Sequence, residues 1–163
     1  MPLDAPFRLG PFVVDTQGRL EPSEPGRFPS FHLGWRGCTV HARLDASGDR
    51  ASLVLSAIIG RVPSSAGADA AVNRARRAAS LRALHTLVSA TGKDTQLRLL
   101  ADHRITFEAR RPVAMPASAG DLLTQITCFL LDLGPYLDLL MEADVPVESA
   151  GAVASAAVGT AKI

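Results

Sequence analysis

Two histidines, His32 and His41, stand where their imidazole rings can come together. Residues 31–35 and 38–44 each alternate apolar and polar side chains, and a two-residue loop at Arg36-Gly37 pairs His32 with His41 across a β-hairpin. Opposite Cβ atoms in such a hairpin are about 5 Å apart, close enough for two rings to share a metal ion. A zinc site normally has a third protein ligand, and the neighbouring strand offers only serines. The sequence therefore favours an exposed cross-strand pair, with metal binding as the alternative.

Three other residues have side chains suited to catalysis. Asp102 and His103 have the side chains that an acid–base pair requires, but adjacent residues of these types in a hairpin loop usually form the turn. Cys128 lies on the apolar side of a predicted helix without a nearby base, which favours a packed thiol over a nucleophile. The only other cysteine, Cys38, is far from Cys128 in the sequence, and the two do not have the spacing of a metal-binding or redox motif. We therefore expect two buried thiols. Glycine-rich phosphate loops, HExxH and GxSxG are absent, and we predict no catalytic residue, cofactor or metal.

The hairpin that carries the histidines begins a predicted β-meander. Its other face is apolar, and the register pairs Trp35 with Cys38, Leu33 with Val40, and Phe31 with Ala42. Trp35 is either the edge of the core or an exposed anchor for a partner. A third strand follows over residues 50–60, with apolar side chains at 51, 53, 55, 57 and 59. We name as candidate partner-binding residues Phe31, Leu33, Trp35 and Val40.

A helix is predicted over residues 70–90, with Asp69 as N-cap and Gly92 at its end. One stripe, which we expect on the sheet, comprises Leu81, Leu84, Leu87 and Val88. A ridge of small side chains, our candidate for helix–helix contact with a second copy, comprises Ala71, Ala75, Ala79 and Ala83. The alternative is that alanine is present only because it is a good helix former.

A second hairpin and a long helix complete the chain. Alternating residues predict arms over 95–99 and 105–109, joined by a three-residue loop that ends with His103 in the left-handed region. Residues 121–141 form the most apolar stretch, with helical spacing and a Ser118 cap. Gly134-Pro135 falls inside this pattern, so we expect a kink or a break there.

The two ends of the chain differ from this pattern. Residues 1–30 are rich in proline and glycine, with a short strand at 12–14, a turn at 15–18 and a return at Arg19-Leu20. Residues 146–163 are small and lack periodicity, which indicates a flexible tail. We therefore predict one α+β domain over 1–145, a two-layer sandwich with a five-stranded antiparallel sheet and two main helices.

Composition and charge exclude several classes of protein. The chain has 163 residues, 47% of them apolar, and a formal net charge of +1. Residues 71–111 carry nine Lys or Arg against three acidic residues, whereas 121–148 carry six acidic residues and no base, so the two parts can neutralise each other. This balance argues against nucleic-acid binding, and polar residues within 121–141 argue against a membrane span. No signal peptide is evident, so we expect a cytoplasmic protein.

The order of elements from Phe31 to Met141 resembles a known fold. A three-strand meander, a helix, a β-hairpin and an apolar helix resemble the class I type III secretion chaperone fold, which YbjN-like bacterial domains share. The stretches behind the resemblance are Trp35-Arg36-Gly37-Cys38, the strand over 50–60, the helix over 70–90, the hairpin over 97–109 and LLTQITCFLLDLGPYLDLLMEA. The resemblance implies a cytoplasmic homodimer that binds a protein segment without chemistry.

Three functions therefore stand as hypotheses. The first is a non-enzymatic protein-binding module that resembles a bacterial secretion chaperone. The second is a YbjN-like regulatory or small-ligand-binding domain. The third is an enzyme that uses His32, His41 or His103.

Overall fold

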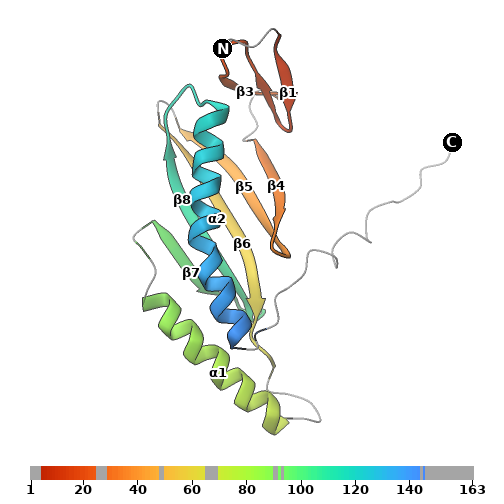
Figure 1. The fold of residues 1–163 in the computed structure, drawn as a ribbon, viewed down its shortest axis with the longest axis vertical. Helices are drawn as coiled ribbons and strands as arrows, with labels where there is room; N and C mark the ends of the chain where they lie inside the picture. The colour runs from red at the N-terminus through yellow and green to blue at the C-terminus, as the bar shows by residue number, and fades with distance from the viewer. Residues whose placement is uncertain are drawn as a thin grey trace, which may run out of the picture.

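The chain forms an α+β structure with two antiparallel sheets and two helices (Figure 1). The computed structural model describes residues 5–24, 29–47, 50–64, 70–89, 92, 94–143 and 145. The predicted cap at Asp69 and the tail over 146–163 lie outside these residues. Within the described part, the α+β class, the five-stranded antiparallel sheet and the two main helices are confirmed.

The larger sheet has the strand order β4-β5-β6-β8-β7. Its strands are β4 (Ser30–Trp35), β5 (Cys38–Ser47), β6 (Arg50–Arg61), β7 (Thr95–Leu99) and β8 (Arg104–Val113). The β4–β5 register is the predicted one, with His32 opposite His41. The turn residues Arg36 and Gly37 have φ values of 47° and 81°, and two positive φ values match the twist of a two-residue hairpin.

The β7–β8 hairpin also has the predicted register and loop. Leu97 pairs with Phe107, and the backbone N–H of Leu100 donates to the carbonyl of Arg104 (2.8 Å), which leaves 101–103 as the loop. His103 has a φ of 69°, in the left-handed region as expected. Asp102 is fixed in the turn because its carboxylate accepts the backbone N–H of Arg104 (3.1 Å). These contacts make Asp102 and His103 turn residues.

Helix α2 (Ala119–Glu142) lies across one face of the larger sheet (Figure 1). Ser118 caps it by accepting the backbone N–H of Asp121, as predicted. Its buried side chains recur every three or four positions: Leu122, Ile126, Phe129, Leu133, Leu137 and Leu140. Each apolar side chain buried in this way contributes about 1.5–3 kcal/mol to stability. The layer of α2 on the sheet is therefore the main core.

The predicted break at Gly134-Pro135 is wrong, because one helix runs through Pro135. A proline leaves the carbonyl four residues earlier without its helical donor, and that carbonyl belongs to Leu131. Both Leu131 and Pro135 are exposed, so water can bond the freed carbonyl on the outer side of the helix. The outer side also includes Leu123, which the apolar pattern grouped with the buried residues.

Helix α1 (Ala70–Ser89) contacts β7 and α2 beside the sheet (Figure 1). Leu84 and Leu87 are buried as predicted, but Leu81 and Val88 are exposed, so half of the stripe expected on the sheet is not buried. Since α2 already covers the centre of that face, α1 has only a narrow strip of apolar surface to bury.

A small antiparallel sheet, β1-β2-β3, forms from the N-terminal segment. Its strands are β1 (Phe7–Leu9), β2 (Phe12–Val14) and β3 (Leu20–Pro22). Strand β2 matches the predicted strand and β3 begins at the predicted return of the chain, whereas β1 was not predicted. The backbone N–H of Leu20 donates to the carbonyl of Ala117 (2.8 Å), and that of Ala119 donates to Gly18 (3.2 Å). The small sheet is thereby joined to the start of α2, and its buried side chains, Phe12, Val14 and Leu20, extend the main core.

Candidate functional site

Strand β4 is an edge of the larger sheet. It pairs with β5 on one side, and no described strand lies on its other side (Figure 1). The opposite edge, β7, lies next to α1. Of the two edge strands of the larger sheet, β7 is therefore the one that α1 lies beside.

The outward backbone groups of β4 follow from its pairing. The backbone N–H of Leu44 donates to the carbonyl of Pro29 (3.0 Å), which marks this pair as hydrogen-bonded. Because hydrogen-bonded pairs alternate along antiparallel strands, residues 31, 33 and 35 bond to β5. The N–H and C=O groups of Ser30, His32 and Gly34 therefore point away from β5, toward the open edge.

Strand β4 lacks the usual features that protect an edge from pairing. Natural edge strands carry charged side chains, proline or bulges that prevent another strand from adding. The sequence of β4, SFHLGW, has no charged or proline residue, and its register with β5 has no bulge. In contrast, β7 carries Arg98. The chemistry of β4 is thus that of a strand able to accept a further strand.

The predicted partner-binding residues lie together on the α2 side of this hairpin. Phe31, Leu33 and Trp35 are half-buried, and Phe31 makes an edge-to-face contact with Phe12 at 6.1 Å. Val40 has no exposed surface, so it belongs to the core and offers nothing to a partner. Trp35 lies against α2, where Gly134 leaves room for its ring. Trp35 is therefore a core-edge residue that is still partly accessible.

The other face of the hairpin belongs to the face of the sheet opposite α2, which we call the open face. The His32 and His41 rings are 6.2 Å apart there, as a cross-strand pair. The strand registers place them in a row of polar residues that crosses all five strands: His32, His41, Ser56, Glu108 and Gln96. A hollow of about 390 Å³ lies over the part of this row from His32 to Glu108 and is also lined by Ser30, Val54 and Arg43.

The metal and thiol alternatives depend on where the described His, Cys, Asp and Glu side chains lie. They contain no group of three His, Cys, Asp or Glu side chains able to hold a metal ion. Cys38 is buried, and burial raises the pKa of its thiol, which opposes nucleophilic reactivity. The prediction that Cys128 is packed is wrong: it lies exposed on the outer side of α2, one position from the buried Phe129.

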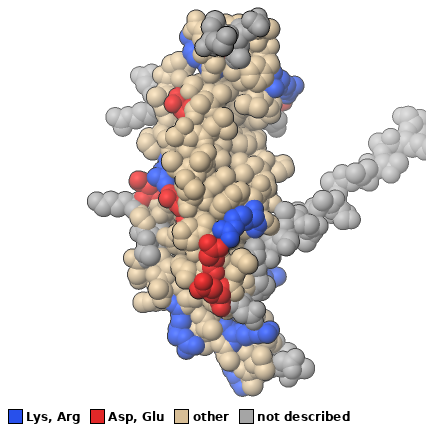
Figure 2. Space-filling model, viewed as in Figure 1, with Lys and Arg blue, Asp and Glu red and all other residues tan. Residues whose placement is uncertain are grey.

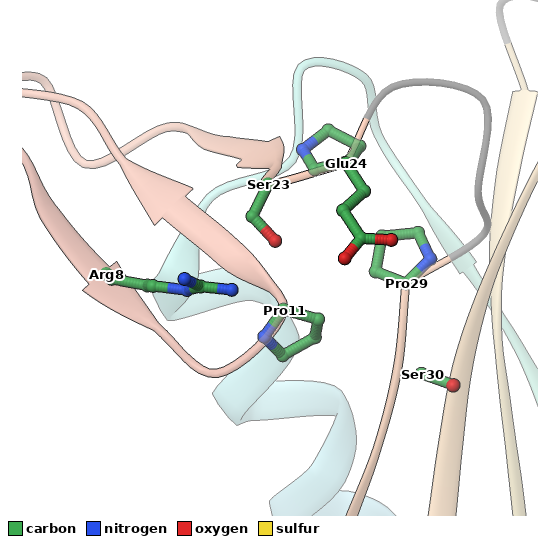
Figure 3. Close-up of a pocket in the computed structure, with 7 residues that line it drawn as sticks. Arg8, Pro11, Ser23, Glu24, Pro29 and Ser30 are labelled. Atoms are coloured by element: carbon green, nitrogen blue, oxygen red, sulfur yellow. The ribbon is translucent and has the colours of Figure 1, made fainter. Parts of the chain in front are cut away.

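A second hollow, of about 450 Å³, lies between the small sheet and β4 (Figure 3). Figure 3 shows Arg8 and Glu24 extending into it, with Pro11 and Pro29 along its sides. It contains one charge of each sign and no nucleophile paired with a base. Its wall includes Ser30, which also lines the hollow of the open face, so both hollows adjoin the start of β4.

The predicted dimer ridge and the outer side of α2 offer further surface. Ala71 and Ala75 are exposed, whereas Ala79 and Ala83 are half-buried. The large apolar side chains exposed on α2 are Leu123, Leu131, Leu139 and Met141. Figure 2 shows few charged side chains over the upper part of α2 and an acidic group beside a basic one near its lower end. Nothing in the structure indicates what covers either surface.

The site differs from the sequence prediction in one respect. The sequence identified the apolar hairpin face, but it did not identify the outward backbone of Ser30, His32 and Gly34 or the nearby Arg43. The predicted register already implied which backbone groups of β4 bond to β5 and which point outward. It could not show that β4 lies at the edge of the sheet, because that depends on how strands elsewhere in the chain pair.

No described helix combines the length and the apolar character that crossing a membrane requires. Comparisons of the chain with protein-family models, curated proteins and solved structures found no match.

Proposed function

We propose that the chain is a non-enzymatic protein-binding module that accepts an extended segment of a partner protein as an additional strand on β4. The observation that carries the proposal is an edge strand with no charge, proline or bulge to prevent pairing. In this mode of recognition, backbone hydrogen bonds supply affinity and side-chain contacts supply specificity.

The two sides of β4 define what the added strand meets. Its backbone can bond the outward groups of Ser30, His32 and Gly34. Its side chains on the α2 side meet the half-buried Phe31, Leu33 and Trp35, whose remaining exposed surface favours apolar partners. The half-burial of these three side chains supports a partner that completes their burial.

The resemblance to class I type III secretion chaperones supports the same proposal. The described elements from β4 to α2 follow the order on which the resemblance rests. By this resemblance we propose a cytoplasmic homodimer, with its contact along Ala71, Ala75, Ala79 and Ala83. The exposed Ala75 is the most suitable position at which to test that contact.

A second candidate function is a YbjN-like regulatory or small-ligand-binding domain. The hollow on the open face favours it, because its volume of about 390 Å³ is within the range of small-molecule sites. However, no helix covers this face among the described residues, and ligand sites usually bury most of their ligand. Partner binding at β4 is therefore the better-supported function.

The test is a pair of substitutions at Gly34. Proline there removes an outward N–H without removing a bond to β5, and alanine keeps that N–H. A Cβ atom at Gly34 meets nothing within 4 Å, so the alanine side chain fits the fold. The circular dichroism spectrum of Gly34→Pro must match that of the wild type for its loss of capture to count. We expect tagged wild-type and Gly34→Ala proteins to capture one polypeptide from the native host at fixed stoichiometry, and Gly34→Pro to lose it. Equal capture by all three proteins would contradict the proposal.

A further inference from the structure

We infer that the partner strand on β4 is acidic on the side that faces away from α2, with carboxylate side chains bound by Arg43, His32 and His41. The inference rests on the proposed function and specifies the chemistry of its partner. It is carried by the arrangement of charges on the open face beside the β4 edge.

Arg43 forms no ion pair with a carboxylate among the described residues; Glu108 lines the same hollow, but its carboxylate pairs with Arg98. Two other arginines on this part of the open face are paired, Arg98 with Glu108 at 3.5 Å and Arg110 with Asp45 at 3.4 Å. Arg43 is exposed and has no ion-pair or hydrogen-bond partner among the residues that the structure describes. An exposed cation without a partner in a hollow favours an anionic ligand.

The position of this cation places it within reach of an added strand. Arg43 is opposite Ser30 on β4, in the register next to the His32–His41 pair. A residue of the added strand opposite His32 would have its Cβ atom about 4.5–5.5 Å from that of His32, on the same face. The hydroxyls of Ser30 and Ser56 line the same hollow and can donate to a carboxylate.

The same residues fit a metal ion less well. A divalent cation bound by His32 and His41 would be repelled by the neighbouring Arg43 guanidinium, and no third ligand lies within the described residues. Glu108, the nearest acid in the row, already pairs with Arg98. The charges therefore favour an anion over a cation at this position.

These two sides together define a sequence pattern for the partner. Successive residues of a strand point to opposite faces, so alternate positions would meet Phe31, Leu33 and Trp35 on one side and Arg43 with the histidines on the other. The partner segment is accordingly one of about six residues in which apolar and acidic side chains alternate, because β4 has six residues.

The test uses three fluorescein-labelled nine-residue peptides in which valine alternates with glutamate, glutamine or lysine. Fluorescence anisotropy at low ionic strength measures their affinity for the wild type, for Arg43→Gln and for the matched control Arg74→Gln, which removes the same charge from the exposed surface of α1. We expect the glutamate peptide to bind the wild type about two- to fivefold more tightly than the glutamine peptide, the range of an exposed charge pair. Arg43→Gln removes this preference, and Arg74→Gln retains it.

The other outcomes separate the inference from the proposed function. If the wild type binds the glutamate and glutamine peptides equally, the inference is overturned and strand addition at β4 stands. If inorganic phosphate displaces the glutamate peptide and binds alone with the same affinity, the hollow is a small-anion site and the inference is again overturned. If none of the three peptides binds at millimolar concentration, both the inference and strand addition are overturned.

Discussion

Arg36 and Asp138, which are 102 positions apart in the sequence, form an ion pair that joins the β4–β5 turn to α2. The Asp138 carboxylate accepts a hydrogen bond from the Arg36 guanidinium and raises the pKa of Arg36. The same guanidinium lies over the ring of Trp35, 5.6 Å from its centroid. The edge that we propose as the binding site is therefore fixed to the helix at one end by a charge pair and an aromatic ring.

Replacing Asp138 with alanine should lower stability only slightly. Both side chains of the pair are exposed, 41% for Arg36 and 55% for Asp138, and water screens the attraction between exposed charges. Urea unfolding of Asp138→Ala, Arg36→Ala and the double variant would measure the coupling energy. Additive effects of the two substitutions would show that the pair contributes nothing beyond the separate side chains.

Gly134 should accept alanine but not leucine. A Cβ atom there lies 3.7 Å from both Trp35 and Arg36, which is ordinary contact, and alanine is about 1 kcal/mol better than glycine in a helix. A leucine side chain would extend into the space that the Trp35 ring occupies and would displace it toward solvent. Trp35 is the only tryptophan, so its fluorescence reports the change directly. We expect unchanged emission for Gly134→Ala and a red shift with lower stability for Gly134→Leu; unshifted emission of the folded leucine variant would argue against this contact.

The loop carboxylate of Asp102 should make stability depend on pH. The backbone N–H of Arg104, aided by its guanidinium, lowers the pKa of Asp102 below its usual value. A carboxyl whose pKa is lower in the folded state stabilises the fold above the unfolded pKa, and this contribution disappears as pH falls through the folded pKa. Asp102→Asn should therefore be less stable than the wild type at pH 7, and the difference should shrink below about pH 4. Thermal unfolding at both pH values tests this, and a difference that is independent of pH would disprove it.

The proposed dimer should depend on the small side chains of α1. Gln at positions 75 and 79 adds bulk to a ridge that requires close approach of two helices. The double variant Ala75→Gln and Ala79→Gln should be monomeric by light scattering, whereas the wild type should have twice the monomer mass. Ala78→Gln, on an exposed neighbouring position of the same helix, is the matched control. A dimer that persists in the double variant would exclude this ridge as the contact.

The local parts of the fold could be predicted because the signals that form them are local. Alternation, turn residues with positive φ and the Ser118 cap each act over a few residues, and the hairpins and α2 match them. The errors concern side chains whose environment depends on distant elements. Cys128 and Val88 are exposed because nothing else in the described chain covers those helix faces. The edge position of β4 could not be predicted for the same reason, because it depends on the strand order of the whole sheet.

The two backbone bonds that connect the small sheet to the start of α2 bear on how the chain folds. They join Gly18 to Ala119 and Leu20 to Ala117, which are 101 and 97 positions apart in the sequence. Residues 18–20 are synthesised well before residues 117–119, so the small sheet cannot form these bonds until the start of α2 is made, and loop closure over that distance precedes any gain from the contact. Until residues 117–119 emerge during synthesis, the small sheet lacks these two bonds, and Phe12, Val14 and Leu20 lack the complete core in which they are buried.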